Sequence, residues 1–169
     1  MRRSTLGFLS ALTVSAVLGS AAPPATADGA GVTCTGTDTT TYDPPVSAVP
    51  QHVKVSIRGT YPLCSSNDPA LTSATTRIEG SGVLSCGEGK FRGDLTIRWN
   101  DGRESSASGG RGIHHRQDDH VFVIGSGKII GGALQGHEIR RVVSMSHRSC
   151  ATGPVSESQG EVVLRLQPR

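Results

Sequence analysis

The stretch from Phe91 to Gly102 reads FRGDLTIRWNDG and decides the fold class. One face of it carries Phe91, Gly93, Leu95, Ile97 and Trp99, and the other carries Arg92, Asp94, Thr96 and Arg98. A period of two is typical of a strand with one buried and one solvated face, so we assign Trp99 to the core. Asn100, Asp101 and Gly102 tolerate the positive φ angles of a tight turn. The stretch therefore predicts the first half of an antiparallel hairpin.

Similar short strands are expected on both sides of this hairpin. They cover residues 32–42, 52–61, 75–86, 91–99, 103–112, 121–127, 138–147 and 158–166. Pro44 and Pro45 are expected to end the first strand, and the glycine-rich residues 128–136 to form a turn and a bend. Crossover helices are missing from the pattern, which argues against a parallel sheet. The sequence predicts an all-β domain of about eight antiparallel strands, as a small barrel or a two-sheet sandwich.

The first 27 residues have the organisation of a secretory signal peptide. Arg2 and Arg3 precede the apolar stretch LGFLSALTVSAVL (residues 6–18), and Ala25-Thr26-Ala27 forms a small-residue cleavage site. The apolar stretch is shorter than the ~20 residues of a spanning helix. We expect a secreted, extracellular protein that has no membrane contact once the signal is removed.

The mature chain is expected to be one domain, residues 28–169. Its length of about 142 residues suits a single hydrophobic core. The whole chain has a formal net charge of +3, and losing Arg2 and Arg3 brings it to about +1. A net charge this close to zero and the scarcity of aromatic residues argue against nucleic-acid binding. A monomer is expected, with an extracellular protein, polymer or small ligand as its partner.

Four cysteines, Cys34, Cys64, Cys86 and Cys150, lie in the mature chain. An even number in an exported chain favours structural disulfides over a metal site or catalytic thiols, and no CxxC spacing occurs. Folding the first two strands back on each other around residues 45–50 would place Cys34 opposite Cys64. We therefore favour Cys34–Cys64 and Cys86–Cys150 among the three possible connectivities.

The segment HHRQDDH, residues 114–120, holds the densest collection of metal-capable side chains. Its candidate ligands are His114, His115, Asp118, Asp119 and His120. No helix holds them on a common face, so a solvated loop between two strands is the favoured interpretation. We predict no metal and no cofactor. The glycine-rich segment Gly125–Gly132 lacks the order of a phosphate-binding loop, and GxSxG is absent, so no catalytic residue is assigned.

Several segments together resemble a group of small secreted four-cysteine β-domain proteins of actinobacteria. They are CTGTDTTTYDPP (34–45), CSSNDP (64–69), LSC (84–86), TIRWNDG (96–102) and GKIIGGALQG (127–136). Their order and the four cysteines carry the resemblance. It implies secretion and an all-β domain, and supplies no activity or catalytic residues. The abundance of Arg and His between Arg103 and Arg148 departs from the group.

Three functions fit these features. The favoured one is a noncatalytic extracellular module that binds its ligand through loops at one end of the domain. The second is a secreted protease inhibitor that presents residues 64–71 beside a disulfide. In the third, a small barrel binds an apolar ligand or acts as an isomerase, with residues 129–132 near its mouth. An interior cavity of several hundred Å³ would favour the third function.

Overall fold

The computed structural model describes residues 31–117, 120–146 and 152–169, so the expected signal peptide lies outside the described residues. The described part is built of strands and contains no helix. Its strands are β1 (Val32–Val46), β2 (Gln51–Ser66), β3 (Ala74–Leu84), β4 (Glu88–Trp99), β5 (Glu104–Gln117), β6 (His120–Lys128), β7 (Gly131–Gly132), β8 (Glu138–Ser146) and β9 (Val155–Gln167). Accordingly, no helix of the described part has the length and apolar character needed to span a membrane.

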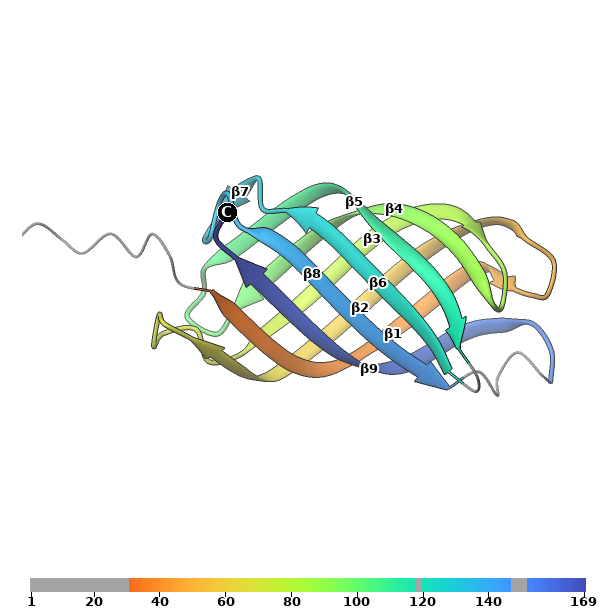
Figure 1. Ribbon diagram of the computed structural model, residues 1–169, viewed down its shortest axis with the longest axis horizontal. Coiled ribbons are helices and arrows are strands. Elements are labelled where there is room, and N and C mark those ends of the chain that lie inside the picture. The colour runs from red at the N-terminus through yellow and green to blue at the C-terminus, as the bar shows by residue number, and fades with distance from the viewer. Residues whose placement is uncertain (1–30, 118–119, 147–151) are drawn as a thin grey trace, which may run out of the picture.

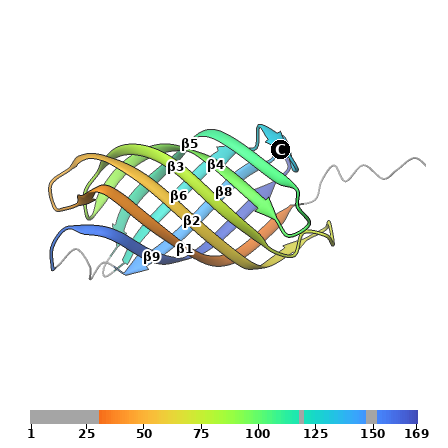
Figure 2. The same ribbon diagram turned by 180° about the vertical axis from the view of Figure 1, so that it is seen from behind.

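Eight of these strands form a closed antiparallel barrel. Each strand pairs with the next along the chain, β8 follows β6 in the wall, and β9 pairs with β1. The short β7 pairs only with β5, outside this ring. Figures 1 and 2 show the same tilted wall from both sides, with the C-terminus and the start of β1 at one end. Closure removes the unpaired edges of an open sheet, and it selects the barrel over the sandwich.

The core lies inside the barrel and follows the alternation of the sequence. On β4, Phe91, Leu95, Ile97 and Trp99 are buried, as predicted. The Trp99 indole donates a 2.9 Å hydrogen bond to Ser105. On β9, Val162, Leu164 and Leu166 are buried by the same alternation. The turn at Asn100–Gly102 is confirmed by the φ of Gly102, which is 87°.

Two inward-facing glycines leave space for neighbouring side chains inside the barrel. A Cβ on Gly112 would lie 2.1 Å from the ring of Phe91, and one on Gly59 would lie 2.4 Å from the Asp38 carboxylate. Both distances are far inside van der Waals contact. These two glycines therefore make room for an aromatic ring and for a buried charge.

Three expected boundaries are wrong. The Pro44–Pro45 pair does not end β1, which reaches Val46 through an irregular stretch in its pairing with β9. The second strand does not end at residue 61 as expected, since β2 runs on to Ser66. The 114–120 segment is mostly strand, because β5 reaches Gln117 and β6 begins at His120. In each case pairing with a neighbouring strand outweighs the local turn or loop signal.

The predicted Cys34–Cys64 disulfide is confirmed. The two residues are opposite each other on β1 and β2, as the folding-back argument required. Cys86 is also disulfide-bonded. Cys150 lies outside the described residues, so the Cys86–Cys150 pairing stays a prediction.

Candidate functional site

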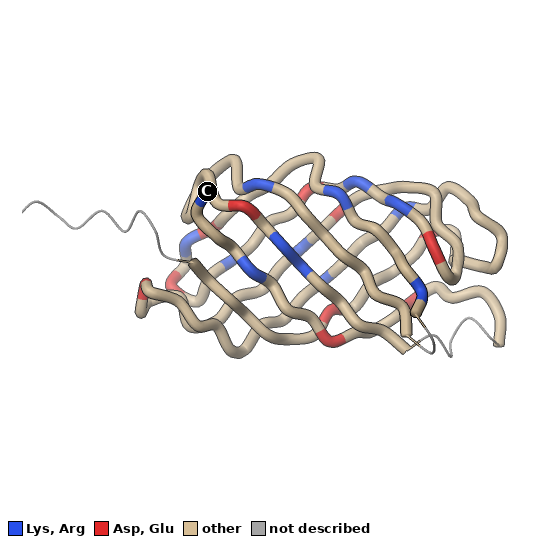
Figure 3. Tube along the Cα trace, viewed as in Figure 1, with Lys and Arg blue, Asp and Glu red and all other residues tan. Residues whose placement is uncertain are grey.

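A row of cationic side chains runs across the outer wall of the barrel. We call Lys54, Arg92, Arg111, Arg140 and Arg165 the basic belt. The register places them in one line, Lys54–Ser81–Arg92–Arg111–Ser126–Arg140–Arg165, which crosses β2, β3, β4, β5, β6, β8 and β9. Figure 3 shows Lys and Arg positions on successive strands across the middle of the barrel. With strands ~4.8 Å apart, the stretch from Arg92 to Arg165 covers roughly 19 Å.

Two pairs of arginines within the belt face each other directly. Arg92 is opposite Arg111, and Arg140 is opposite Arg165. Like charges directly opposite on neighbouring strands destabilise a sheet. The arrangement therefore has an energetic penalty that a bound anion would relieve.

The belt residues take part in no ion pair within the described part of the chain. The ion pairs of the described residues use Arg77, Arg98, Arg103, Arg141 and Arg169, and none uses a belt residue. On one side of the belt, the next outward row contains Lys90 and the apolar residues Ile113, Ile124, Val142 and Val163, and it has no carboxylate between β2 and β9. The row on the other side contains Glu79, Asp94 and Glu138, of which Glu79 pairs with Arg77 and Glu138 with Arg169. The belt thus concentrates positive charge without ion pairs on one line of the described wall.

A second set of arginines lies elsewhere on the wall, in a groove of about 390 Å³ over β2, β3 and β4. Arg58, Arg77 and Arg98 line it together with Thr60, Thr75 and Thr96. Here Arg77 pairs with Glu79 at 2.9 Å, and Arg98 pairs with Glu104 at 2.8 Å. Both pairs are well exposed and contribute little to stability. The groove has less unpaired charge than the belt.

The barrel interior holds a buried ion pair. Asp38 of β1 and Arg141 of β8 form a salt bridge, and their side chains are 0% and 4% exposed. The Tyr61 hydroxyl donates to Asp38 at 3.3 Å. Burial lowers the pKa of Arg141 to about 10 and raises that of Tyr61 to about 12. At neutral pH the arginine is therefore charged and the tyrosine is protonated.

His114 points into the same interior, farther along the barrel. Its ring meets Tyr42 and Phe91 edge-on, with ring centroids 6.4 and 6.5 Å away, and its Nδ1 atom has no hydrogen-bond partner. Burial lowers the pKa of His114 to about 4. The imidazole is therefore neutral in the folded protein at physiological pH.

This pKa predicts a loss of stability in acid. An unfolded histidine has a pKa near 6.5, so between pH 6.5 and pH 4 the unfolded state binds a proton that the native state does not. The stability contribution of His114 is thus complete above pH 6.5 and falls by on the order of 3 kcal/mol as the pH drops to 4. Urea unfolding at pH 7 and pH 4 measures this change. His114→Gln should show a shallower decline, and an identical decline in both proteins would contradict the assignment.

The structure separates the residues of the predicted metal loop. His114 faces the interior, whereas His115 and His120 are exposed, and the His120 ring stacks on Phe122. Asp118 and Asp119 lie outside the described residues. Within the described ranges no three His, Cys, Asp or Glu side chains are grouped to hold a metal ion. Because β5 alternates, it sends neighbouring histidines to opposite sides of its wall.

The predicted inhibitor loop, residues 64–71, is held against the barrel. Asn100 accepts hydrogen bonds from the backbone N–H groups of Thr72 and Ser73 and donates one to the Ala70 carbonyl. Arg103 forms an ion pair with Asp68, in which its Nη2 atom lies 2.7 Å from the carboxylate Oδ2 atom. The loop folds into a turn in which the Leu71 amide donates to the Asp68 carbonyl, and Leu71 is buried. Protease inhibition stays a prediction.

Side chains fill most of the barrel interior. Three cavities lie along it, with volumes of about 50, 30 and 10 Å³. The largest contacts Arg141, and the two smaller ones contact His114. All three are well below the several hundred Å³ that a large enclosed apolar ligand needs.

Comparison with known proteins adds no relative. No protein-family model, curated protein or solved structure matches the chain. The resemblance to actinobacterial secreted proteins stays a prediction, and function has to be argued from the geometry.

Sequence reasoning missed both the belt and the buried ion pair. Arg141 shares the strand phase of Ile139, Val143 and Met145, and this phase was a usable signal. Charged residues are seldom fully buried, so an inward position of Arg141 is hard to infer from its strand alone. The belt needs the register of seven strands, which no single strand pattern contains.

Proposed function

We propose that the mature chain is a secreted, noncatalytic binding barrel whose basic belt holds an anionic cell-wall polymer. The observation that carries the proposal is the line of five cations that have no ion-pair partner among the described residues, in which two arginine pairs oppose each other. A linear polymer with regularly spaced phosphate or carboxylate groups matches the belt in charge and shape. Complementary charge of this kind gives specificity and fast association.

Two further features agree with this proposal. The Cys34–Cys64 disulfide is of a kind that persists in oxidising, extracellular surroundings. The apolar row beside the belt, which includes Ile113, Ile124 and Val142, is exposed and offers contact to the uncharged backbone of a polymer. The binding surface is therefore the wall of the barrel and not the loops at its end.

The test is binding of the mature protein to poly(glycerol phosphate) and to polygalacturonate, with neutral dextran as the control polymer. Binding to at least one polyanion is expected, and it should weaken as salt is added because the belt is exposed. The affinity of the triple variant Arg92→Gln, Arg140→Gln, Arg165→Gln should be lower by about tenfold or more. The variant removes three of the five belt charges and breaks both pairs of opposed arginines.

The matched control is Arg58→Gln, Arg77→Gln, Arg98→Gln, which removes the same charge from the groove over β2, β3 and β4. It should keep its affinity within about threefold, because two of its arginines are already paired. The phosphate polymer and the carboxylate polymer are tested in separate titrations, and binding of either one supports the proposal. Failure of both polyanions, equal binding of dextran, or equal losses in the two triple variants would overturn it.

A further inference from the structure

The wall of the barrel is incomplete between β5 and β6. These strands pair only from Arg111–Ser126 to Gln117–His120, and β5 then turns to β7 through Ser105 and Ser106. A bulge starts the separation, since the register with β4 slips between Gly93 and Leu95 and Gly109 takes a φ of 66°. Asp94 holds the bulge by accepting hydrogen bonds from the Ser108 hydroxyl at 2.7 Å and the Gly109 amide at 3.0 Å. We call the resulting gap the β5–β6 window.

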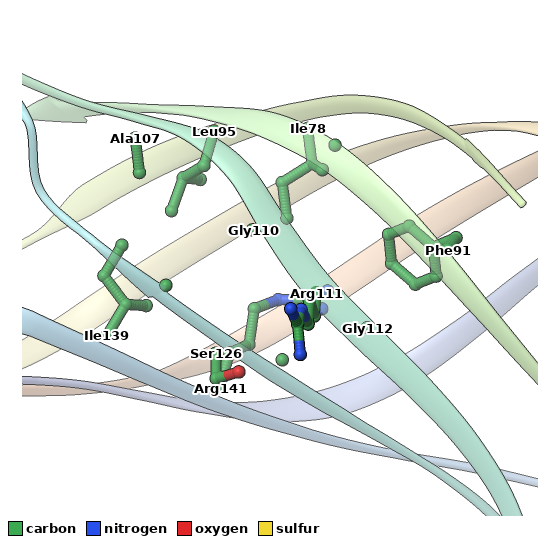
Figure 4. A pocket seen from close by; sticks show the side chains of 13 residues that line it. Ile78, Phe91, Leu95, Ala107, Gly110, Arg111, Gly112, Ser126, Ile139 and Arg141 are labelled. Carbon is green, nitrogen blue, oxygen red and sulfur yellow. The ribbon is translucent and has the colours of Figure 1, made fainter.

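The largest interior cavity, about 50 Å³, lies beneath this window and is partly open to the surface. Its inner surface is apolar and includes Ile78, Phe91, Leu95, Ala107 and Ile139. Gly110, Arg111, Ser126 and Gly127 line its outer side, where a Cβ added to Gly127 would lie 3.6 Å from the Gly110 Cα. Figure 4 shows these apolar side chains around the space where β5 and β6 diverge.

Arg141 gives the cavity a polar end. Its side chain lines the cavity and is 4% exposed. One guanidinium nitrogen, Nη2, is engaged by Asp38, whereas the Nε–H group is buried and has no partner. A buried donor without an acceptor destabilises the folded state, and a ligand oxygen in this position would remove that penalty.

We propose that the β5–β6 window is a second binding site, for a small neutral molecule that is mostly apolar and has one hydrogen-bond-accepting oxygen, such as a ketone. The carbonyl oxygen accepts the Nε–H hydrogen bond of Arg141, and the hydrocarbon part contacts the apolar wall. A neutral ligand is favoured because Asp38 already balances the charge of Arg141. Arg111 of the basic belt and Ser126 of the same line also line this cavity, so the window lies beside the belt, and the polar end made by Arg141 lies inside the barrel.

The experiment titrates cyclopentanone into the ¹⁵N-labelled mature protein and follows the side-chain Nε–H resonance of Arg141. Saturable, downfield movement of this signal is expected, with millimolar affinity because few atoms are buried. Gly127→Val should weaken binding about tenfold or more by filling the window. A Cβ at this position meets its nearest neighbours at 3.6 and 3.7 Å, which is ordinary van der Waals contact.

The matched control is Gly87→Val, where an added Cβ meets only Arg116, at 3.9 Å. It should leave the titration unchanged. An unmoved Arg141 signal would overturn the proposal and would indicate a cavity that holds only water. Equal affinity in the wild type and Gly127→Val would overturn it as well, because binding would then not pass through the window. Loss of polymer binding in the belt variant has no bearing on this outcome, so the two proposals fail separately.

Discussion

Replacing Asp38 by Ala destabilises the protein by about 3–5 kcal/mol, the expected loss when one partner of a buried ion pair is removed. The change leaves the Arg141 guanidinium inside the barrel without a counter-charge, and the Tyr61 hydroxyl loses its acceptor. Neither group reaches water, because both side chains lie within the closed wall. Denaturation by guanidinium chloride measures the free energy of unfolding.

The double variant Asp38→Leu, Arg141→Met is the control for this experiment. It removes both charges and keeps apolar volume, so it should recover most of the stability lost in Asp38→Ala. Asp38→Asn provides a milder change if the Ala variant does not fold. A loss below about 1 kcal/mol in Asp38→Ala would show that the pair is not buried as described.

Removing the Cys34–Cys64 disulfide is expected to lower the free energy of unfolding by about 3.5 kcal/mol on the chain-entropy model. The bond closes a loop with a sequence separation of 30 residues, so its loss enlarges the unfolded ensemble. The variant Cys34→Ala, Cys64→Ala tests this by thermal and denaturant unfolding. Both positions are buried in the wall, and packing losses add to the effect.

The double alanine variant is preferable to chemical reduction, which would also break the bond made by Cys86. Thiol titration of the unfolded variant should detect no free cysteine. If the variant unfolds within about 1 kcal/mol of the wild type, the disulfide does not limit the unfolded state as the entropy model requires.

Individual strands were predictable because burial on one face imposes a period of two. The β4 stretch from Phe91 to Trp99 and the β9 positions Val162, Leu164 and Leu166 follow that rule. The Cys34–Cys64 pairing was also predictable, since two neighbouring strands joined by a turn place their ends opposite each other. Local signals were less reliable at the boundaries, where Pro44 and His114 lie within strands.

The candidate sites were not predictable in the same way. The belt joins Lys54 to Arg165 through six strand pairings, and a shift of one residue in any pairing would break the line. The window depends on a bulge that Asp94 holds from the neighbouring strand. Both features arise between strands, from register and hydrogen bonds that the pattern of a single strand does not contain.

The sequence by itself determined the all-β class, the alternation of its strands, the core position of Trp99 and one disulfide. These properties depend on side-chain period and on neighbours in the chain. Only the tertiary structure decided the closure of β9 on β1, the meeting of Asp38 with Arg141 and the line of cations on the wall. The physical reason is register, because cross-strand pairing fixes which distant residues become neighbours. The sequence of a single strand does not specify which strand it pairs with or in which register.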